Sequence, residues 1–358
     1  ITDDTITTDQ IADTSVHGRR NLIINGGMTV AERQGTTTIN NSQAYSPVDR
    51  FQGIGSSGGI FDITQSTTSP DGFKNSLKVE VTTADSSIGA SEYYVIDQRI
   101  EGSNIPQLAW GTSAAKDVTL SFWVRSSVTG THGGAVSNSA ANRSYPFTYT
   151  ISAADTWEYK TIAIDGDTSG TWLTTTGVGI RLYWGLGAGA TPSGTAGAWG
   201  AAEYRTATGA VQLIGTANAT WYMTGAQLEV GIATPFEHRS FSEELQLCRR
   251  YFYAQQPKGL TSQATNDANC ILGTSYGANN VYAVIEFQTE MRVYPAVSSG
   301  GTWYARANNS ISFTGAFGTQ RRGRNNYTVG QTAGSHSAGA TLWCEPGNGS
   351  YLYFDAEL

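Results

Sequence analysis

Apolar and polar residues alternate along several short segments of the chain, and this period of two predicts β-strands. In the segment DVTLSFWVRS every second residue is apolar and shares one face: Val118, Leu120, Phe122 and Val124. Strands are also predicted in SLKVEVTT, YYVIDQRI, YPFTYTIS, WEYKTIAID, GVGIRLYWGL and ATWYMTGAQLEV. Many short strands separated by turn residues are typical of an antiparallel β-sandwich or jelly roll.

Two segments depart from this pattern. The first 16 residues repeat an apolar residue every five positions: Ile1, Ile6, Ile11 and Val16. One chain cannot bury so sparse a row, so residues 1 to about 18 are expected to be the end of a shaft formed by several chains. Residues 187–210, GAGATPSGTAGAWGAAEYRTATGA, have little periodicity and are expected to form a large surface loop.

A helix is predicted after the last of these strands. Ser240 and Glu243 form an S-x-x-E capping box, which satisfies backbone donors at a helix start. Leu245, Cys248 and Phe252 then follow at helical spacing. This stripe packs either on its own chain or against its copies around an axis. Beyond the helix, NCILGTSY, VYAVIEFQTEMRV, TWYARANNSISFTGAF and SYLYFDAEL predict a second, smaller β domain.

Composition narrows the class of partner. The 358 residues carry a formal net charge of −7, which argues against nucleic acid, and aromatic residues at 11% argue against disorder. No apolar run approaches the roughly 20 residues that span a bilayer. Three widely spaced cysteines, Cys248, Cys270 and Cys344, fit neither a disulfide framework nor a zinc site.

Candidate chemistry is sparse. The four histidines are isolated in sequence, and no nucleophile elbow, Walker loop or dinucleotide fingerprint is present. The segments DITQSTTSPDGF and IDGDTSG can supply oxygen ligands for calcium, but such residues are more often plain turns, so no metal or cofactor is expected. Paired carboxylates of a glycosidase are not excluded by sequence, yet nothing positive indicates an enzyme.

The aromatic residues are the best candidates for binding. Trp123 and Trp184 lie on alternating strands and are expected in the core. Trp199 and Tyr204 lie in the loop, where they either stack on sugar rings or hold the loop to its own domain. In the C-terminal part, basic and aromatic residues are expected to bind an acidic glycan or to form a solvated hairpin tip: Trp303, Tyr304, Arg321, Arg322, Arg324 and Tyr327.

A resemblance supports this interpretation. The stretches NLIINGGMTVAERQG, YSPVDRF, SPDGFKNSLKV, VTLSFWVRSSVTGT, DTWEYKTIAIDGDTSGTW and TGAQLEVGIATPFEHRSFSEELQLCRRYF resemble a module of bacteriophage tail fibre and related virion proteins. The match covers about residues 21 to 253. That resemblance implies a jelly roll similar to carbohydrate-binding modules and brings no catalytic residues. The N-terminal repeat resembles fibre shaft repeats, and the C-terminal part is similar to small β domains that end such proteins.

The expected protein is therefore an all-β virion structural protein, assembled in the host cytoplasm, that binds host surface polysaccharide. We expect a shaft end at 1–20, a jelly roll at 21–238, a connecting helix at 239–256 and a C-terminal β domain at 257–358. A homotrimer is expected, with oligomerisation residues Ile1, Ile6, Ile11, Val16, Leu245 and Cys248, alongside other virion proteins and without membrane insertion. The alternatives are a capsid decoration or baseplate protein, and then a polysaccharide depolymerase.

Overall fold

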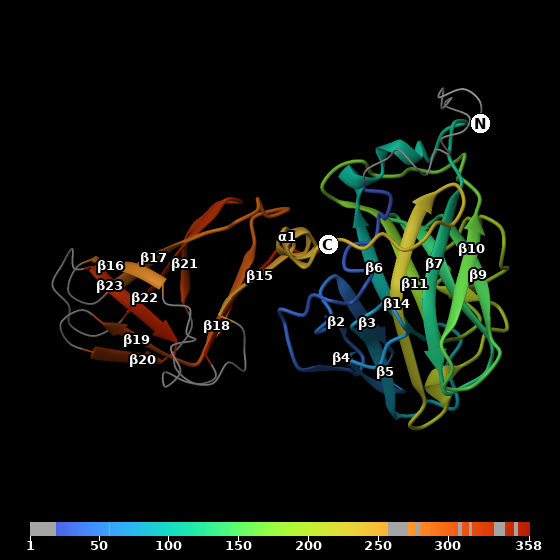
Figure 1. Ribbon diagram of the computed structural model, residues 1–358, viewed down its shortest axis with the longest axis horizontal. Helices are drawn as coiled ribbons and strands as arrows, with labels where there is room; N and C mark the ends of the chain where they lie inside the picture. The colour runs from blue at the N-terminus through green and yellow to red at the C-terminus, as the bar shows by residue number, and fades with distance from the viewer. Residues whose placement is uncertain are drawn as a thin grey trace, which may run out of the picture. The chain divides into compact units, whose positions relative to one another are not determined.

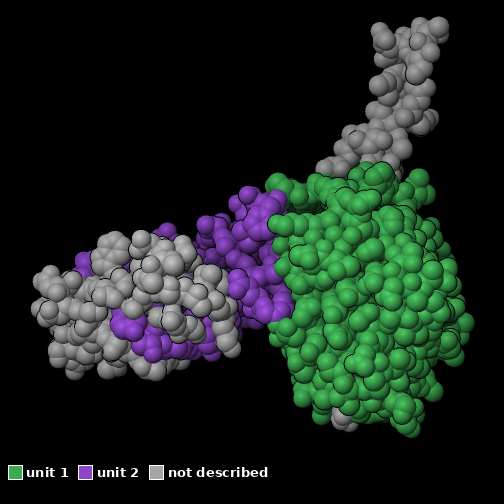
Figure 2. Space-filling model, turned by 60° about the horizontal axis from the view of Figure 1, so that its bottom comes forward, with its two compact units in different colours: residues 1–29, 36–46, 50–240 green, residues 30–35, 47–49, 241–358 purple. Residues whose placement is uncertain are grey.

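The computed structural model describes residues 19–56, 58–256, 271–276, 280–306, 310–314, 317–332, 341–346 and 350–358. The chain divides into two compact units, coloured separately in Figure 2. The first unit consists of residues 1–29, 36–46 and 50–240, and the second consists of residues 30–35, 47–49 and 241–358. The expected shaft residues Ile1, Ile6, Ile11 and Val16 lie outside the described residues.

The first unit is a sandwich of two six-stranded antiparallel sheets (Figure 1), which confirms the predicted all-β fold. The strands of the first sheet are, in spatial order, β1 (Thr36–Ile39), β4 (Ile60–Ser66), β5 (Ser76–Thr83), β14 (Thr220–Val230), β7 (Val118–Ser126) and β10 (Glu158–Ile164). Those of the second sheet are β2 (Gln43–Tyr45), β3 (Phe51–Gly55), β6 (Tyr93–Glu101), β11 (Val178–Ala188), β8 (Gly130–Asn138) and β9 (Ser144–Ile151).

All seven strands predicted for this unit are present as β5, β6, β7, β9, β10, β11 and β14. The strands β1 to β4 and β8 were not predicted; β1, β2 and β3 are short, and β8 is rich in Gly, which weakens the strand signal. For β4 (IFDITQS) neither reason applies. Short 3-10 helices occupy part of the connections: η1 (Gly102–Asn104), η2 (Pro106–Leu108) and η3 (Leu213–Gly215).

The core lies between the two sheets and follows the alternation of the strands. The apolar residues of β7 at positions 118, 120, 122 and 124 are buried, as predicted. Trp184 of β11 and Trp221 of β14 have no exposed surface. Phe122 packs edge-on against Trp184, with ring centroids 6.0 Å apart. The prediction of Trp184 as a core residue is therefore confirmed.

Residues 189–212, here called the insert, cover the outer face of the second sheet and contain the two-stranded parallel sheet of β12 (Ser193–Gly194) and β13 (Thr206–Ala207). Two strand glycines allow this close approach, since a Cβ on Gly133 or Gly185 would lie 2.5 or 2.6 Å from Thr206 Oγ1. The insert is thus a packed part of the sandwich, which corrects the expectation of a plain surface loop.

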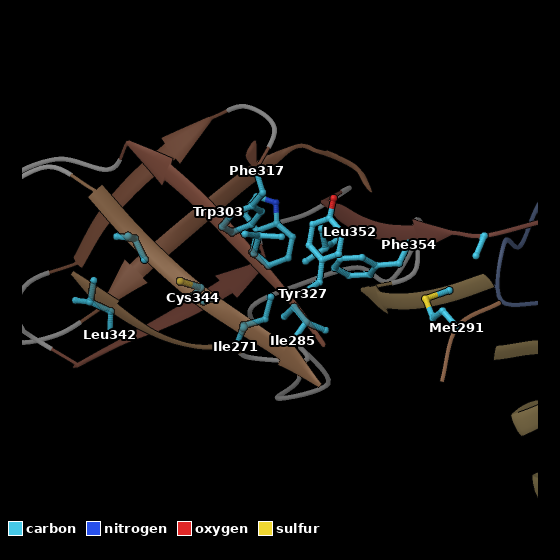
Figure 3. Close-up of a cluster of buried hydrophobic side chains, with 14 residues drawn as sticks. Ile271, Ile285, Met291, Trp303, Phe317, Tyr327, Leu342, Cys344, Leu352 and Phe354 are labelled. Atoms are coloured by element: carbon cyan, nitrogen blue, oxygen red, sulfur yellow. The ribbon is translucent and has the colours of Figure 1, made fainter. Parts of the chain in front are cut away.

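In the described residues, the second unit contains two further sheets and one helix. A three-stranded sheet has the order β15 (Phe252–Gln256), β24 (Tyr351–Asp355) and β18 (Ala296–Gly300). The seven-stranded sheet has the order β20 (Ser310–Thr314), β19 (Thr302–Arg306), β23 (Thr341–Pro346), β16 (Ile271–Tyr276), β17 (Asn280–Glu286), β22 (Asn326–Thr332) and β21 (Gly318–Arg322). Figure 3 shows the apolar core of this unit, in which Trp303 meets Phe317 and Tyr327 meets Phe354.

The predicted helix is present as α1 (Phe241–Arg249), directly after the capping-box serine. Phe252 does not extend the helical stripe as expected, because the helix ends at Arg249 and Phe252 begins β15. Leu245 is half-buried and Cys248 has no exposed surface. A fully buried Cys248 packs within its own chain, which corrects its assignment as an oligomerisation residue.

An arginine cluster joins the separate segments of the second unit. Arg33 pairs with Asp355 at 2.9 Å, and its guanidinium lies 3.6 Å from the ring centroid of Phe252. It also lies 3.6 Å from Asp49, whose carboxyl group has no exposed surface. Burial raises the pKa of Asp49 to about 7. Arg249 of α1 pairs with Glu32 at 2.7 Å, so residues 30–35 and 47–49 are held to the unit by charge.

Candidate functional site

An open cleft of about 470 Å³ lies on the first unit, and we call it the aromatic cleft. Four parts of the chain form it: the turn before β5, the outer face of β7, the outer face of β10, and residues 231–239, here called the connector. Its lining consists of Asp71, Gly72, Phe73, Trp123, Tyr159, Ala233, Thr234, Pro235, Phe236 and His238. Five of these ten residues carry an aromatic ring, counting the imidazole of His238, which is the composition of many small-molecule sites.

Trp123 and Tyr159 form the floor of the cleft on the sheet. They are direct cross-strand partners in the pairing of β7 with β10. Their ring centroids are 5.4 Å apart with an interplanar angle of 49°, and Tyr159 is 42% exposed. Trp123 is half-buried and faces outward, which corrects its expected place in the core. The reason is that successive side chains of a strand point to opposite faces, and the neighbours Phe122 and Val124 point inward.

Phe73, Phe236 and His238 form a second group of rings in the cleft. The ring centroids of Phe73 and Phe236 are 5.1 Å apart, and those of Phe236 and His238 are 4.9 Å apart, both edge to face. Phe73 and His238 complete the triangle at 5.3 Å. Edge-to-face contacts of this kind hold aromatic rings in defined orientations. We call these three rings the wall of the cleft, and their contacts with one another hold them in position.

A glycine brings the wall and the floor together. Gly225 lies at an irregularity in the pairing of β14 with β7 and has a φ of 64°, a conformation that favours glycine. A Cβ at this position would lie 2.7 Å from Phe73 Cζ and 3.2 Å from Trp123 Cδ1. Because Gly225 has no side chain, Phe73 can pack beside Trp123.

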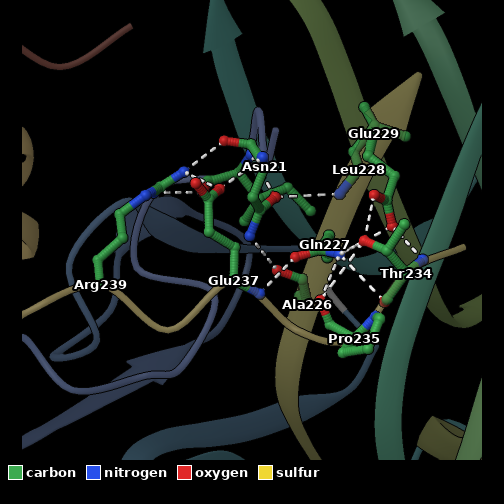
Figure 4. Close-up of polar contacts among 10 residues, drawn as sticks. Asn21, Ala226, Gln227, Leu228, Glu229, Thr234, Pro235, Glu237 and Arg239 are labelled. Carbon is green, nitrogen blue, oxygen red and sulfur yellow. Dashed lines mark hydrogen bonds and ion pairs between the residues drawn. The ribbon is translucent and has the colours of Figure 1, made fainter. Parts of the chain in front are cut away.

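The connector is fixed to the end of β14 by hydrogen bonds drawn in Figure 4. The Thr234 hydroxyl donates to Glu229 Oε2 at 2.6 Å, and the Thr234 backbone N–H donates to Glu229 Oε1 at 2.8 Å. Gln227 accepts a hydrogen bond from the backbone N–H of Glu237 at 2.8 Å. Gln227 and Glu229 are themselves buried, so these bonds are shielded from water.

Asn21 ties the start of the unit to the same connector. Its backbone N–H donates to Glu237 Oε2 at 2.8 Å, and its side chain donates to the carbonyl of Ala226 at 3.0 Å. Arg239 donates to the carbonyls of Asn21 and Ile23. Figure 4 shows these contacts on both sides of Glu237. Phe236 and His238 are therefore presented by a segment anchored on either side.

The charge of the cleft is low. Asp71 is exposed and has no ion-pair partner among the described residues, and it is the one carboxylate in the lining. Across the described part of the chain, no group of three His, Cys, Asp or Glu side chains is placed to hold a metal ion. The cleft offers aromatic faces with a carboxylate, an imidazole and the Thr234 hydroxyl beside them. Such a surface suits a ligand with both apolar faces and hydroxyl groups.

The predicted loop aromatics are packed into their own domain. Trp199 donates from Nε1 to the carbonyl of Asp165 at 2.8 Å and lies edge-on to Trp110 and Trp172, each at 5.4 Å between centroids. Tyr204 contacts Gly194, where a Cβ would lie 2.5 Å from its ring. Both side chains are half-buried, and neither lines the aromatic cleft. Of the two interpretations for these residues, the packing supports the one that holds the insert in place.

The C-terminal candidates are divided between core and surface. Trp303 and Tyr327 have no exposed surface, so neither can stack on a sugar, and their assignment as binding residues is corrected. Tyr304 and Arg324 are half-buried. Arg324 pairs with Glu290 at 3.0 Å and donates to the carbonyl of Met291. Burial thus takes two aromatic members out of the expected basic and aromatic patch.

A buried polar cluster lies beneath the insert on the second sheet. Gln52 and Arg99 both donate to Asp97 Oδ2, at 3.0 and 3.1 Å. Burial raises the pKa of Asp97, whose side chain has no exposed surface. Arg205 of the insert stacks over the ring of Tyr93, 3.9 Å from its centroid. The chain's own insert therefore fills this face, and the aromatic cleft is the open face with exposed rings.

Sequence reasoning did not single out the cleft residues as a group. They come from four separate parts of the chain: Asp71 and Phe73, then Trp123, then Tyr159, then Phe236 and His238. A signal was present for Trp123 and Tyr159, because both occupy the polar phase of an alternating strand. An aromatic residue in the outward phase is exposed unless another element covers it.

No protein-family model matches the chain, and no curated protein sequence matches it. Solved structures are similar to it in fold. One is the enzymatically active domain of tailspike protein 4 of bacteriophage CBA120, with a TM-score of 0.32 and 10% identity over 59% of this chain and 21% of that chain. Another is TmCBM61 in complex with β-1,4-galactotriose, with a TM-score of 0.29 and 10% identity over 59% of this chain and 99% of that one.

The family 11 carbohydrate-binding module of a Clostridium thermocellum cellulase is also similar, with a TM-score of 0.27 and 11% identity over 57% of this chain and 98% of that one. Identities and TM-scores this low carry no ligand or site over to this chain. Among the described residues, no helix is long and apolar enough to cross a membrane. The function is therefore argued from the geometry of the cleft.

Proposed function

We propose that the chain binds a saccharide non-covalently in the aromatic cleft. The observation that carries this proposal is the pair of Trp123 and Tyr159, two adjacent rings on the outer face of a sheet inside an open cleft. Sugar rings have apolar C–H faces that pack on aromatic rings, while their hydroxyl groups hydrogen-bond to polar groups at the edge. Asp71, His238 and Thr234 provide such groups.

Rigid presentation supports the same proposal. The floor rings lie on paired strands, and Phe236 and His238 lie on a connector fixed through Glu229, Gln227 and Asn21. A site that is ordered before binding loses less conformational entropy when the ligand arrives. The β-sandwich thus supplies a preformed surface for a weak, non-covalent ligand.

At the level of the particle, we propose that the protein is a phage virion structural protein of the tail fibre type, which attaches to host surface polysaccharide. The resemblance of residues 21 to 253 to tail fibre modules and the five-residue N-terminal repeat support this role. A homotrimer would place three clefts on one particle appendage. Several linked sites convert weak single-site binding into strong avidity. The proposed activity is binding without cleavage of the glycan.

The test is a glycan array probed with the full chain and with the variants Trp123→Ala and Tyr159→Ala. Removing one central aromatic anchor typically costs about 2 kcal/mol or more, which is roughly a thirtyfold loss of affinity. We expect both variants to lose binding to the glycans that the wild type retains. Tyr294→Ala is the matched control, because Tyr294 is 63% exposed and lies outside the cleft.

Two results would overturn the proposal. One is an array on which the wild type binds no saccharide at high protein concentration. The other is full retention of binding by both cleft variants, which would place the site elsewhere. Circular dichroism of each variant separates loss of the cleft from loss of the fold, because a variant that keeps the wild-type spectrum and no longer binds has lost the site alone.

A further inference from the structure

The outer face of the first sheet carries a second row of side chains beside the cleft floor. Tyr222 of β14 pairs in register with Lys78 of β5 on one side and Arg125 of β7 on the other. Trp157 directly precedes β10, and its ring lies 6.2 Å from that of Tyr222. Because residues two apart along a strand share a face, this row lies about 7 Å from the row of Trp123 and Tyr159.

The side chains of the second row pack against one another and leave an aromatic ring partly open to solvent. Arg125 lies over the Tyr222 ring, 4.9 Å from its centroid, and Tyr222 is 8% exposed. Trp157 stands edge-on to Tyr222 with an interplanar angle of 67° and keeps part of its surface open. Trp157 and Tyr159 point to the same face, since one residue separates them. The aromatic surface therefore continues past the cleft along β10.

The charges of the second row cancel. Lys78 pairs with Glu80 at 2.6 Å, and Arg125 pairs with Asp155 at 2.9 Å. The hydrogen bond to Glu80 raises the pKa of Lys78, so this ammonium group stays charged and paired. A carboxylate on a ligand would have to displace Glu80 or Asp155 to reach these cations. Hydroxyl groups, in contrast, can hydrogen-bond to both partners of each pair without separating them.

The residues that line the aromatic cleft also favour a neutral ligand over an anionic one. Its one carboxylate, Asp71, repels an anionic ligand, and the exposed Lys74 nearby is not part of the lining. The two rows together thus offer aromatic faces and balanced charge. An uncharged chain of sugars satisfies both features.

We propose that Trp157, with Tyr222 and Arg125 behind it, forms a second subsite that extends the aromatic cleft and accepts an internal stretch of a neutral polysaccharide. This inference rests on the proposed saccharide binding at Trp123 and Tyr159 and adds the class of glycan and the length of the site. Its consequence is that affinity grows with the number of sugar units, because longer chains reach Trp157 while short ones occupy the cleft alone.

The experiment is isothermal titration of the full chain with neutral oligosaccharides of the cello, xylo, manno and galacto series, each from disaccharide to hexasaccharide. Oligogalacturonates provide the acidic counterpart of the galacto series. The variants are Trp157→Ala and Trp157→Phe, the second of which keeps a ring and tests whether stacking is the cause. Thr161→Ala is the control, because Thr161 is an exposed residue on the outer face of β10.

We expect at least one neutral series to gain about fivefold or more in affinity between disaccharide and hexasaccharide. Trp157→Ala should remove that gain and leave disaccharide binding unchanged, while Trp157→Phe and Thr161→Ala should keep most of it. Affinity that is independent of length, or a length gain that survives Trp157→Ala, would overturn the second subsite. Oligogalacturonates that bind more tightly than neutral galacto-oligosaccharides would overturn the assignment to neutral glycans.

These outcomes are distinct from failure of the proposed function. If no neutral or acidic saccharide binds, both the cleft and its extension are wrong. If Trp123→Ala abolishes binding while Trp157→Ala has no effect at any chain length, the cleft stands and the second subsite falls.

Discussion

Gly225 determines the shape of the aromatic cleft at the scale of a single residue. Its φ of 64° breaks the regular pairing of β14, and the absence of a side chain leaves room for Phe73. Phe73 in turn contacts Phe236 and His238, so one backbone position controls three of the five rings. The site therefore depends on a residue that has no chemistry of its own.

Gly225→Ala is expected to weaken both the fold and the site. Alanine at this φ costs about 1 kcal/mol or more, and its Cβ would lie 2.7 Å from Phe73 Cζ. Phe73 must then move away from Trp123, and glycan affinity should fall about tenfold. Denaturant unfolding and titration with a bound glycan measure the two effects. Gly209→Ala is the control, since Gly209 also has a positive φ but no atom near its Cβ position.

An unchanged affinity in a folded Gly225→Ala protein would show that Phe73 does not contribute to the site. Loss of stability in Gly209→Ala without loss of binding would fit the account, because that position shares the backbone strain and lies outside the cleft.

At Trp123, the alternation of β7 and the size of the side chain favour opposite faces of the sheet. The alternation of β7 correctly placed Val118, Leu120, Phe122 and Val124 inside. By the same alternation Trp123 had to point outward, yet its size favoured the core. The hydrophobicity of Trp123 favours the core and its position in the alternation favours the outer face, and the alternation sets the direction of the side chain. A large aromatic residue in the polar phase of a strand was the strongest sequence signal for the site.

At the scale of elements, the connector is the part of the site with the least regular structure. Residues 231–239 form no strand or helix, so their position depends on side-chain hydrogen bonds instead of a ladder. The Thr234 hydroxyl and backbone both bond to the buried carboxylate of Glu229. A carboxylate without its donors in that place would be costly, which keeps the connector closed on the sheet.

Thr234→Val is expected to loosen the connector while leaving the sheet intact. The variant has nearly the same shape but lacks the donor to Glu229, so the free energy of unfolding should fall by about 1–3 kcal/mol. Glycan affinity should fall as Phe236 and His238 lose their fixed position. Hydrogen exchange of the amides from 231 to 239 and titration with glycan measure the change, and Thr234→Ser restores the hydroxyl as control.

Equal exchange rates in Thr234→Val and wild type would contradict this account of the connector. Pro235 lies between the last strand of the sandwich and the helix, and a proline at that place favours a connector over a continued strand. The sequence does not indicate which side chains anchor the connector, because Asn21 and Glu237 are distant in sequence and come together only in the fold.

In the insert, the local sequence and the tertiary packing favour different structures. Its many Gly, Ala and Thr residues carry no period, so a surface loop was the natural expectation. Tertiary packing overrides that expectation through Gly133 and Gly185, whose missing side chains admit Thr206 against the second sheet. Glycines in strands marked a close approach of backbone, but the sequence did not show which segment approached.

At the scale of the whole molecule, the sequence predicted an all-β chain because strand alternation and turn residues are local signals. The helix α1 was predicted for the same reason. Strand order is not local, and it is strand order that assembles the site. The order β5, β14, β7 and β10 brings the turn at Asp71, the rings of Trp123 and Tyr159 and the connector after β14 to one face.

The segmented make-up of the second unit was likewise outside the reach of sequence patterns. Residues 30–35 and 47–49 belong to it, held by Arg33 and by the pair of Arg249 with Glu32. A linear division of the chain into consecutive domains does not represent such short returning segments. Ion pairs between residues more than 200 positions apart leave no periodic trace in sequence.

The most direct test of the central claim is a crystal structure of the full chain with a bound oligosaccharide from the series that it binds most tightly. The account predicts a sugar ring packed on Trp123 and Tyr159, within reach of Asp71 and His238. Sugar bound on the second sheet or on residues of the second unit, with the aromatic cleft empty, would contradict it.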